Sequence, residues 1–286
     1  MALVMAAGSF VAGSTSMGGG AVAFPVMTLA FDISPSVARD FSLMIQSVGM
    51  MAASAAIVMM WVTVEKKALL WAGIGGLPGL LFGYEVLSPL LAAAVVKTLF
   101  ASVVFSFGLM LWWTNRYANR FRVTTIRRFG SVVGLELFAA GLAGGIISGI
   151  LGSGIDIAVF SVLVLRFGIC EKVATPTSVI LMGTNALAGM LWGGASGTLA
   201  AEAWDYWWVC VPVVAFGAPF GAWCMSRWRR VHIVRFICVL ILVQYVGTLL
   251  ILPQTPTLLA WNILVIASSL LLLRLFHQAC ETRRTP

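Results

Sequence analysis

Two glycine-rich segments interrupt long apolar stretches of this sequence: Gly13-Ser14-Thr15-Ser16-Met17-Gly18-Gly19-Gly20 and Ser148-Gly149-Ile150-Leu151-Gly152-Ser153-Gly154-Ile155-Asp156. We call them the first and the second break. Because glycine inside a helix costs about 1 kcal/mol relative to alanine, such clusters favour a helix that stops and restarts. Within a bilayer, non-helical backbone is tolerated only where it is buried in protein or lines a polar cavity. Paired breaks of this kind indicate a transporter's binding site, so we expect the substrate to lie between them.

The composition indicates an integral membrane protein. The chain has 286 residues, of which 60% are hydrophobic and 10% are charged, and its mean hydropathy is +1.01. Soluble domains carry about 25% charged residues. At about 20 residues for each spanning helix, the chain has room for eight or nine spans. The net charge of +8 comes mostly from arginines in two loops and the tail, which indicates membrane orientation rather than nucleic-acid binding.

Cysteine and histidine spacing argues against a metal site, a cofactor and an enzyme. The cysteines show no CxxC spacing and no histidine companion, so they predict neither a disulfide framework nor a metal site; they are Cys170, Cys210, Cys224, Cys238 and Cys280. His232 and His277 lie near predicted membrane edges. No combination of His, Cys and acidic residues has ligand or triad spacing, which disfavours a membrane-embedded enzyme.

Loop charge predicts the topology. Arginine clusters lie at 114–128 and 227–235, and both should be cytoplasmic, so an even number of crossings must separate them. The apolar stretches 130–165, 173–195 and 206–225 give three crossings if each spans once. A single helix over 130–165 would be about 54 Å long, well beyond a hydrocarbon core of about 30 Å. A hairpin that returns to its own side shortens this stretch and makes the count even.

These considerations predict an all-α integral membrane protein with two inverted-topology repeats, each a broken or re-entrant helical hairpin followed by three spanning helices. One extra helix follows at the C-terminus. The predicted parts are a first repeat (1–113), a basic cytoplasmic linker (114–129), a second repeat (130–252) and a final helix with a basic cytoplasmic tail (253–286). Gly79-x-x-x-Gly83 matches Gly217-x-x-x-Gly221, and we expect these four glycines to be helix-packing positions. Ser34-Pro35 and Thr175-Pro176 are predicted helix starts.

The repeated glycine pattern resembles the TauE/SafE sulfite exporter family, also called the 4-toluene sulfonate uptake permeases. The first copy is Ser16-Met17-Gly18-Gly19-Gly20 to Pro25, then Ala38-Arg39-Asp40-Phe41-Ser42-Leu43; the second is Gly152-Ser153-Gly154-Ile155-Asp156, then Ala174-Thr175-Pro176-Thr177-Ser178. The resemblance covers nearly the whole chain and implies transport of sulfite, sulfonates or related organosulfur anions. The chain departs from the pattern where Ile155 and Asp156 replace glycines and Ser161 replaces a proline.

Hydroxyl groups and free backbone N–H groups at a helix break suit an anion. Polar stripes on the helices that follow each break are expected to line the cavity, and Lys97 is a charge inside a predicted span, where charges are usually functional. We expect Asp156 to pair with Lys97 or to carry a coupling proton, and Arg39 and Asp40 to pair locally at the outer mouth. The predicted substrate-binding residues are Ser14, Thr15, Ser16, Gly18, Gly19, Gly20, Ser42, Gln46, Lys97, Ser148, Gly149, Gly152, Ser153, Gly154, Asp156, Thr177 and Asn185.

The sequence thus predicts a secondary transporter of a small organosulfur anion in the bilayer, with no cofactor, no metal and no nucleic-acid partner. The expected location is the inner (plasma) membrane of a bacterium, with a cytoplasmic C-terminus. Another small anion, such as a carboxylate or another oxyanion, and a non-transporting scaffold or receptor are open alternatives. Proton coupling, homodimer formation and the direction of transport also remain open.

Overall fold

Helices make up the regular structure of this protein. The computed structural model describes residues 2–15, 19–116, 123–126, 129–227, 230–251 and 255–282. Within these ranges the only β-type pairing is an isolated bridge between Val123 and Ile169. The prediction of an all-α fold is therefore confirmed.

The described residues of the first half form five helical units before the basic linker. They are α1 (Ala2–Ser14), α2 (Gly20–Pro25) continued by the π segment η1 (Val26–Ala30), α3 (Pro35–Met59), α4 (Lys66–Phe82) continued by η2 (Gly83–Leu87) and η3 (Ser88–Leu90), and α5 (Ala93–Arg116). The second half contains α6 (Ser131–Leu151), α7 (Ile155–Ser161) continued by the π segment η4 (Val162–Arg166), α8 (Glu171–Ser196), α9 (Ala201–Arg227), α10 (Arg230–Ile251) and α11 (Pro256–Thr282).

Within the described residues, five helical stretches are long and apolar enough to cross a membrane, so the protein is an integral membrane protein. They are Pro35–Met59, Lys66–Leu90, Ser131–Leu151, Glu171–Ser196 and Ala201–Arg227. Shorter apolar stretches occupy α1 and parts of α5, α10 and α11.

One of the two predicted helix starts is confirmed and the other is wrong. Ser34 caps α3 by accepting a hydrogen bond from Val37 N, and Pro35 is the first helical residue. By contrast, α8 begins at Glu171, because the N–H groups of Val173 and Ala174 already bond to the carbonyl of Cys170. Pro176 therefore lies inside α8 rather than at its start.

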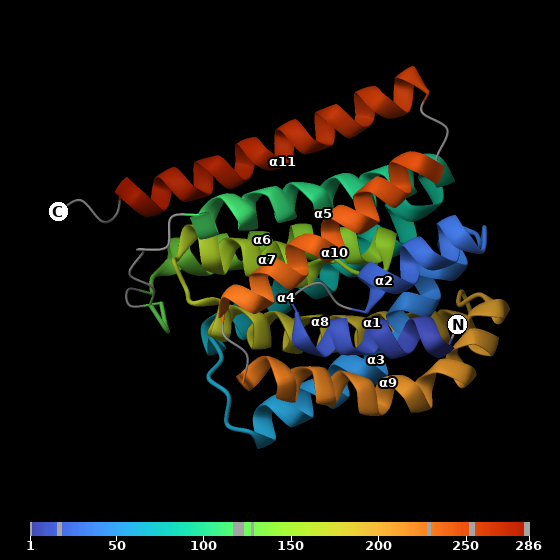
Figure 1. The fold of residues 1–286 in the computed structure, drawn as a ribbon, viewed down its shortest axis with the longest axis horizontal. Coiled ribbons are helices and arrows are strands. Elements are labelled where there is room, and N and C mark those ends of the chain that lie inside the picture. Colours follow the sequence, from blue (N-terminus) through green and yellow to red (C-terminus); the bar gives the residue numbers. More distant parts are fainter. Residues whose placement is uncertain are drawn as a thin grey trace.

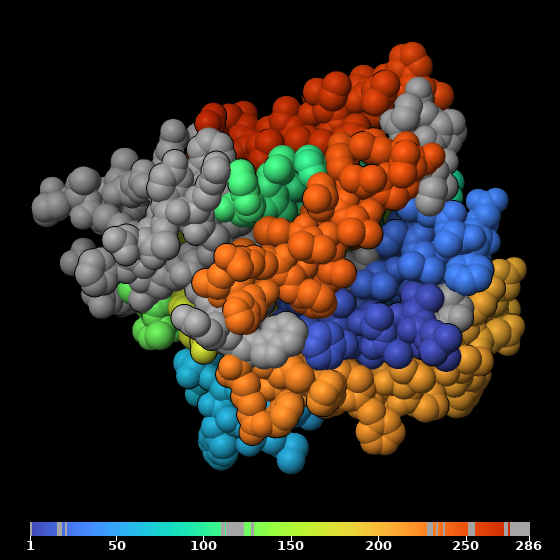
Figure 2. All heavy atoms as spheres, viewed as in Figure 1, coloured from blue at the N-terminus to red at the C-terminus, as the bar shows by residue number. Residues whose placement is uncertain are grey.

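The helices run broadly along one direction, with α9 at one edge of the molecule and α11 at the other (Figure 1). The connection between α3 and α4 lies at the left end of this view. The C-terminal ends of α5, α9 and α11 and the start of α6 lie at the same end. Figure 2 shows α10 and α11 on the upper part of the visible face, above α1 and α9.

Glycines allow two helix pairs to approach backbone to backbone. Gly79 of α4 and Gly83, the first residue of η2, lie against the carbonyl oxygens of Leu142 and Ile146 in α6. The second pair is α1 with α9, where Gly221 of α9 lies against the carbonyl of Phe10 in α1. Gly217 faces the Ser9 side chain of α1, and Gly13 of α1 meets the backbone of Ala218 in α9. The prediction that Gly79, Gly83, Gly217 and Gly221 are packing positions is confirmed.

Candidate functional site: the meeting point of the two breaks

The two breaks meet inside the protein, beside α3. A methyl group placed on Gly20, at the start of α2, would lie 2.7 Å from Gln46 Nε2 and 2.9 Å from Ser153 Cβ. Gly19 faces the same glutamine, with its Cβ position 3.8 Å from Gln46 Cγ. Residues from the first break, the second break and α3 are therefore in direct contact.

Gln46 connects α3 to the second break. Its Nε2 donates to the carbonyl of Ser42 at 2.9 Å and to the carbonyl of Gly152 at 2.8 Å. Both amide hydrogens are used in this way, and turning the amide over would point its oxygen at two carbonyl oxygens. The side chain is 1% exposed, and its Oε1 has no hydrogen-bond partner.

Gly152 ends α6 in a conformation that suits glycine. Its φ is +79°, in the left-handed region that disfavours side chains. A Cβ at this position would also lie 2.6 Å from Ser42 Cβ and 2.7 Å from the carbonyl oxygen of Arg39. The second break is thus held directly against the N-terminal half of α3.

The start of α7 has its backbone donors satisfied from within the break. Ile155 N donates to Ser148 Oγ at 3.0 Å, and Ile157 N donates to Asp156 Oδ1 at 3.0 Å. Asp156 is fully buried, and its Oδ2 has no hydrogen-bond partner. Buried polar atoms are rarely left without a partner, so each exception asks for an explanation. Around the break the exceptions are Ser42 Oγ, Gln46 Oε1 and Asp156 Oδ2.

A buried ion pair adjoins this meeting point at the start of α3. Arg39 and Asp40 lie 2.7 Å apart, and their side chains are 8% and 2% exposed. The Arg39 guanidinium also donates to Ser88 Oγ and lies 3.8 Å from the centre of the Tyr84 ring. Asp40 accepts from the Tyr84 hydroxyl and from Ala200 N. The pair therefore links α3, the η2–η3 segment and the α8–α9 connection.

Comparison with protein families identifies the family of this chain. The family model described as Sulfite exporter TauE/SafE matches residues 1–250. The chain belongs to the TauE/SafE family. Members of this family are membrane transporters of sulfite and related anions rather than enzymes. No curated protein and no solved structure matches the chain. In this TauE/SafE protein, α11 (Pro256–Thr282) lies beyond the matched residues.

Several predicted site residues of the TauE/SafE chain lie together, and others do not. Gly19, Gly20, Ser42, Gln46, Gly152 and Ser153 share the meeting point, and Ser148, Gly154 and Asp156 belong to the same break. Ser14 and Thr15 end α1 and are buried, and both hydroxyls donate to the carbonyl of Val11. Gly149 packs against the backbone of Leu80 and Tyr84. Ser16 and Gly18 lie outside the described residues.

Lys97 has a different partner from the one expected. Its Nζ donates to the carbonyl of Thr28 at 2.7 Å and lies 3.8 Å from the exposed carboxylate of Asp32. The expected Lys97–Asp156 pair is wrong, because Lys97 faces the end of η1 and not the second break. Sequence position gives the depth of a residue along its helix but not the helix it faces.

Thr177 contacts the start of α4, whereas Asn185 lines a cavity that Ile155 of the second break also lines. Thr177 Oγ1 accepts from Glu65 N at 2.9 Å and so anchors the start of α4. Asn185 is 3% exposed, and neither of its amide atoms has a partner. It lines a cavity of about 260 Å³ between α4 and α8, together with Gly73, Leu181 and Ile155.

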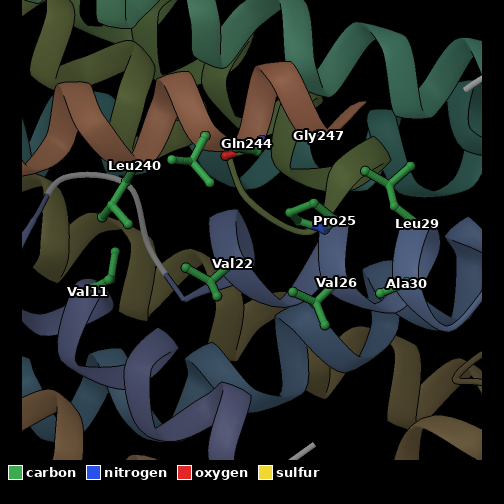
Figure 3. A pocket seen from close by; sticks show the side chains of 10 residues that line it. Val11, Val22, Pro25, Val26, Leu29, Ala30, Leu240, Gln244 and Gly247 are labelled. Carbon is green, nitrogen blue, oxygen red and sulfur yellow. The ribbon is translucent and has the colours of Figure 1, made fainter. Parts of the chain in front are cut away.

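Two further cavities flank the hairpins. One of about 380 Å³ is lined by residues of α5, α6, α7 and α11, with Gly154 and Ile157 near the second break and the Glu136–Arg166 ion pair among its lining residues. Another of about 260 Å³ lies between the first hairpin and α10, where Gln244 is the polar side chain among apolar neighbours (Figure 3). Neither cavity includes Ser42 or Gln46, and both of these residues are buried.

Groups of three or more His, Cys, Asp or Glu with metal-binding proximity are absent from the described part of the chain.

Several elements of the site have no clear sequence signal. Tyr84 and Ala200 are distant from Asp40 in the sequence but donate hydrogen bonds to it. In the sequence, the ion pair is indicated only by the adjacent residues Arg39 and Asp40.

Proposed function

We propose that this protein is a secondary transporter of a small organosulfur anion, such as sulfite or a sulfonate, held at mid-membrane between the two breaks. The contact that carries this proposal is the hydrogen bond from Gln46 to Gly152, beside Gly20 and Ser153. It supports a site shared by both hairpins and α3, with buried polar atoms available to a ligand. Non-helical backbone at membrane depth is expected where a site must be lined with polar groups.

We further propose that the two halves are inverted repeats that alternate access to this site. The order α1, break, α2, η1 is followed in the second half by α6, break, α7, η4. If α3, α4 and α5 correspond to α8, α9 and α10, then the close α4–α6 pair corresponds to the close α9–α1 pair. This correspondence supports a pseudo-symmetric arrangement of the two halves, in which each hairpin packs on a glycine-rich helix of the other half.

The proposed orientation places the basic linker, 114–129, and the C-terminus in the cytoplasm. The ends of α5, α9 and α11 that approach the arginine clusters lie at one end of the molecule (Figure 1). Lysine and arginine are enriched on the cytoplasmic side of membrane proteins, which supports this assignment and the inner membrane of a bacterium as the location. The repeats then cover 1–113 and 130–252, and 253–286 adds one helix and a basic tail.

Asp156 is the proposed coupling group, because this acid, without a cationic partner in the described residues, lies in the first turn of α7, three positions after Ser153. Burying a charged carboxylate is costly, so movement of a proton on and off this group can be linked to opening of the break.

Thermal unfolding of the detergent-purified protein against a panel of small anions at fixed ionic strength tests the proposed function. A ligand present at 100 times its dissociation constant stabilises the folded state by about 2.7 kcal/mol. We expect sulfite or a sulfonate to raise the melting temperature of the wild type and to raise that of Ser42→Ala less. Ser47→Ala is the matched control, because Ser47 Oγ bonds to Met44 O and Met190 Sδ, away from the breaks.

A shift with carboxylates alone would replace the organosulfur substrate and leave the site intact. Silence across the whole panel would favour a scaffold or receptor that transports nothing.

A further inference from the structure

Two buried polar atoms at the meeting point, Ser42 Oγ and Gln46 Oε1, have no hydrogen-bond partner. They indicate which hydrogen-bonding groups the substrate must carry, an inference that rests on the proposed function. Ser42 differs from its neighbours on α3. Ser47 and Ser54 each donate to a backbone carbonyl one turn earlier, at 2.7 and 2.6 Å. Ser42 Oγ is fully buried and makes no such bond. Its hydroxyl remains able both to donate and to accept.

Gln46 contributes an acceptor and no further donor. Its two amide hydrogens are committed to the carbonyls of Ser42 and Gly152, which fixes the direction of the amide. Gln46 Oε1 therefore lies away from those carbonyls, buried and without a donor. Only a group that brings its own N–H or O–H can satisfy this atom.

Nearby cations are engaged elsewhere. The Arg39 guanidinium donates to Asp40 and Ser88, and Lys97 bonds to Thr28 and approaches Asp32. The charged side chain inside the second break is an acid, Asp156, whose Oδ2 also lacks a donor. Among these described side chains, a dianion that carries only acceptor oxygens would meet two acceptor oxygens, Gln46 Oε1 and Asp156 Oδ2, opposite the Ser42 hydroxyl.

We infer that the transported anion carries its own hydrogen-bond donor, and that the site discriminates against oxyanions without one. Hydrogensulfite and sulfonates that bear an N–H or O–H group beside the sulfur belong to the accepted class. In the bound state the donor of the anion bonds to Gln46 Oε1, and one of its oxygens accepts from Ser42 Oγ.

Two probes of equal charge and similar size separate this class from its counterpart. Sulfamate and methanesulfonate differ in that an amino group replaces a methyl group. Each is added as a competitor of labelled sulfite uptake into proteoliposomes at fixed pH and ionic strength. We expect the inhibition constant of sulfamate to be at least about tenfold lower than that of methanesulfonate. Methanesulfonate leaves the buried Gln46 Oε1 without a donor, which weakens binding by about that factor.

Gln46→Met removes the amide at similar side-chain length and should bring the two inhibition constants together. Ser42→Ala should weaken both competitors by a similar factor while keeping their ratio, and it provides a second variant if Gln46→Met does not fold. Gln244→Met is the matched control and should keep the wild-type ratio of inhibition constants, because Gln244 belongs to α10 and lines the separate cavity between α10 and the first hairpin.

Equal inhibition of the wild type by both competitors, or stronger inhibition by methanesulfonate, would overturn the inference and leave the proposed transport function standing. Absence of sulfite uptake, with neither probe bound, would instead remove the proposed function.

Discussion

Gln46 Nε2 donates to the carbonyl oxygen of Gly152 at 2.8 Å, and so ties the middle of α3 to the residue where α6 ends. The two residues are separated by more than a hundred positions in the chain. Since Gly20 lies against the same amide, one side chain contacts both hairpins. Movement of either hairpin relative to α3 must change this contact, which makes it the natural place for coupling between substrate and conformation.

Gly152 is predicted to be intolerant of any side chain. Gly152→Ala adds the strain of a left-handed alanine, about 1–2 kcal/mol, and a collision with Ser42 and the Arg39 carbonyl. We expect a lower melting temperature and loss of sulfite uptake. Gly197→Ala is the matched control, because Gly197 has φ +69° but nothing within 4 Å of its Cβ position. Equal effects of the two substitutions would contradict a special role for the contact at Gly152.

The close α4–α6 contact predicts that Gly145 cannot be enlarged. Gly145→Ala places a methyl group on the carbonyl of Gly76 and the N–H of Leu80, so we expect a loss of about 1–3 kcal/mol in unfolding free energy. Gly247→Ala, in α10, meets nothing within 4 Å and should be neutral or stabilising by up to about 1 kcal/mol. Denaturation of both variants in the same detergent compares them, and a Gly145→Ala protein as stable as Gly247→Ala would refute the packing argument.

The Arg39–Asp40 pair is predicted to stabilise the fold far more than the Lys97–Asp32 pair does. Asp40→Asn leaves the buried guanidinium without its counter-charge, and we expect destabilisation of about 3 kcal/mol or more. Asp32→Asn affects a carboxylate that is 98% exposed and should leave the melting temperature unchanged. A mild effect of Asp40→Asn, similar to that of Asp32→Asn, would show that the pair does not hold the α8–α9 connection to α3.

Proton coupling through Asp156 predicts a selective defect. Asp156→Asn should keep exchange of labelled sulfite between two equal pools but lose the acceleration that a pH gradient gives to net uptake. The reason is that an amide cannot carry a proton between the two sides of the membrane. Full pH-gradient dependence in Asp156→Asn proteoliposomes would exclude this residue as the coupling group.

Sequence reasoning reaches the breaks because glycine clusters and charge parity are local signals. The stripe of Ser42 and Gln46 was predictable from helical spacing, and the packing role of Gly79 and Gly83 from small-residue spacing. Contacts between distant segments were not predictable, since no local pattern encodes which helix a side chain faces. The expected Lys97–Asp156 pair is therefore wrong. The hydrogen bonds that Glu65 N donates to Thr177 and that Ala200 N donates to Asp40 have no local sequence signal.

Uptake of labelled sulfite by proteoliposomes, measured for the wild type, Gln46→Ala and Gly247→Ala, tests the central claim most directly. We predict saturable uptake by the wild type and by Gly247→Ala, and a rate at least about tenfold lower in Gln46→Ala, as the loss of hydrogen bonds in a buried site requires. Uptake by Gln46→Ala at the wild-type rate would contradict a substrate held between the two breaks.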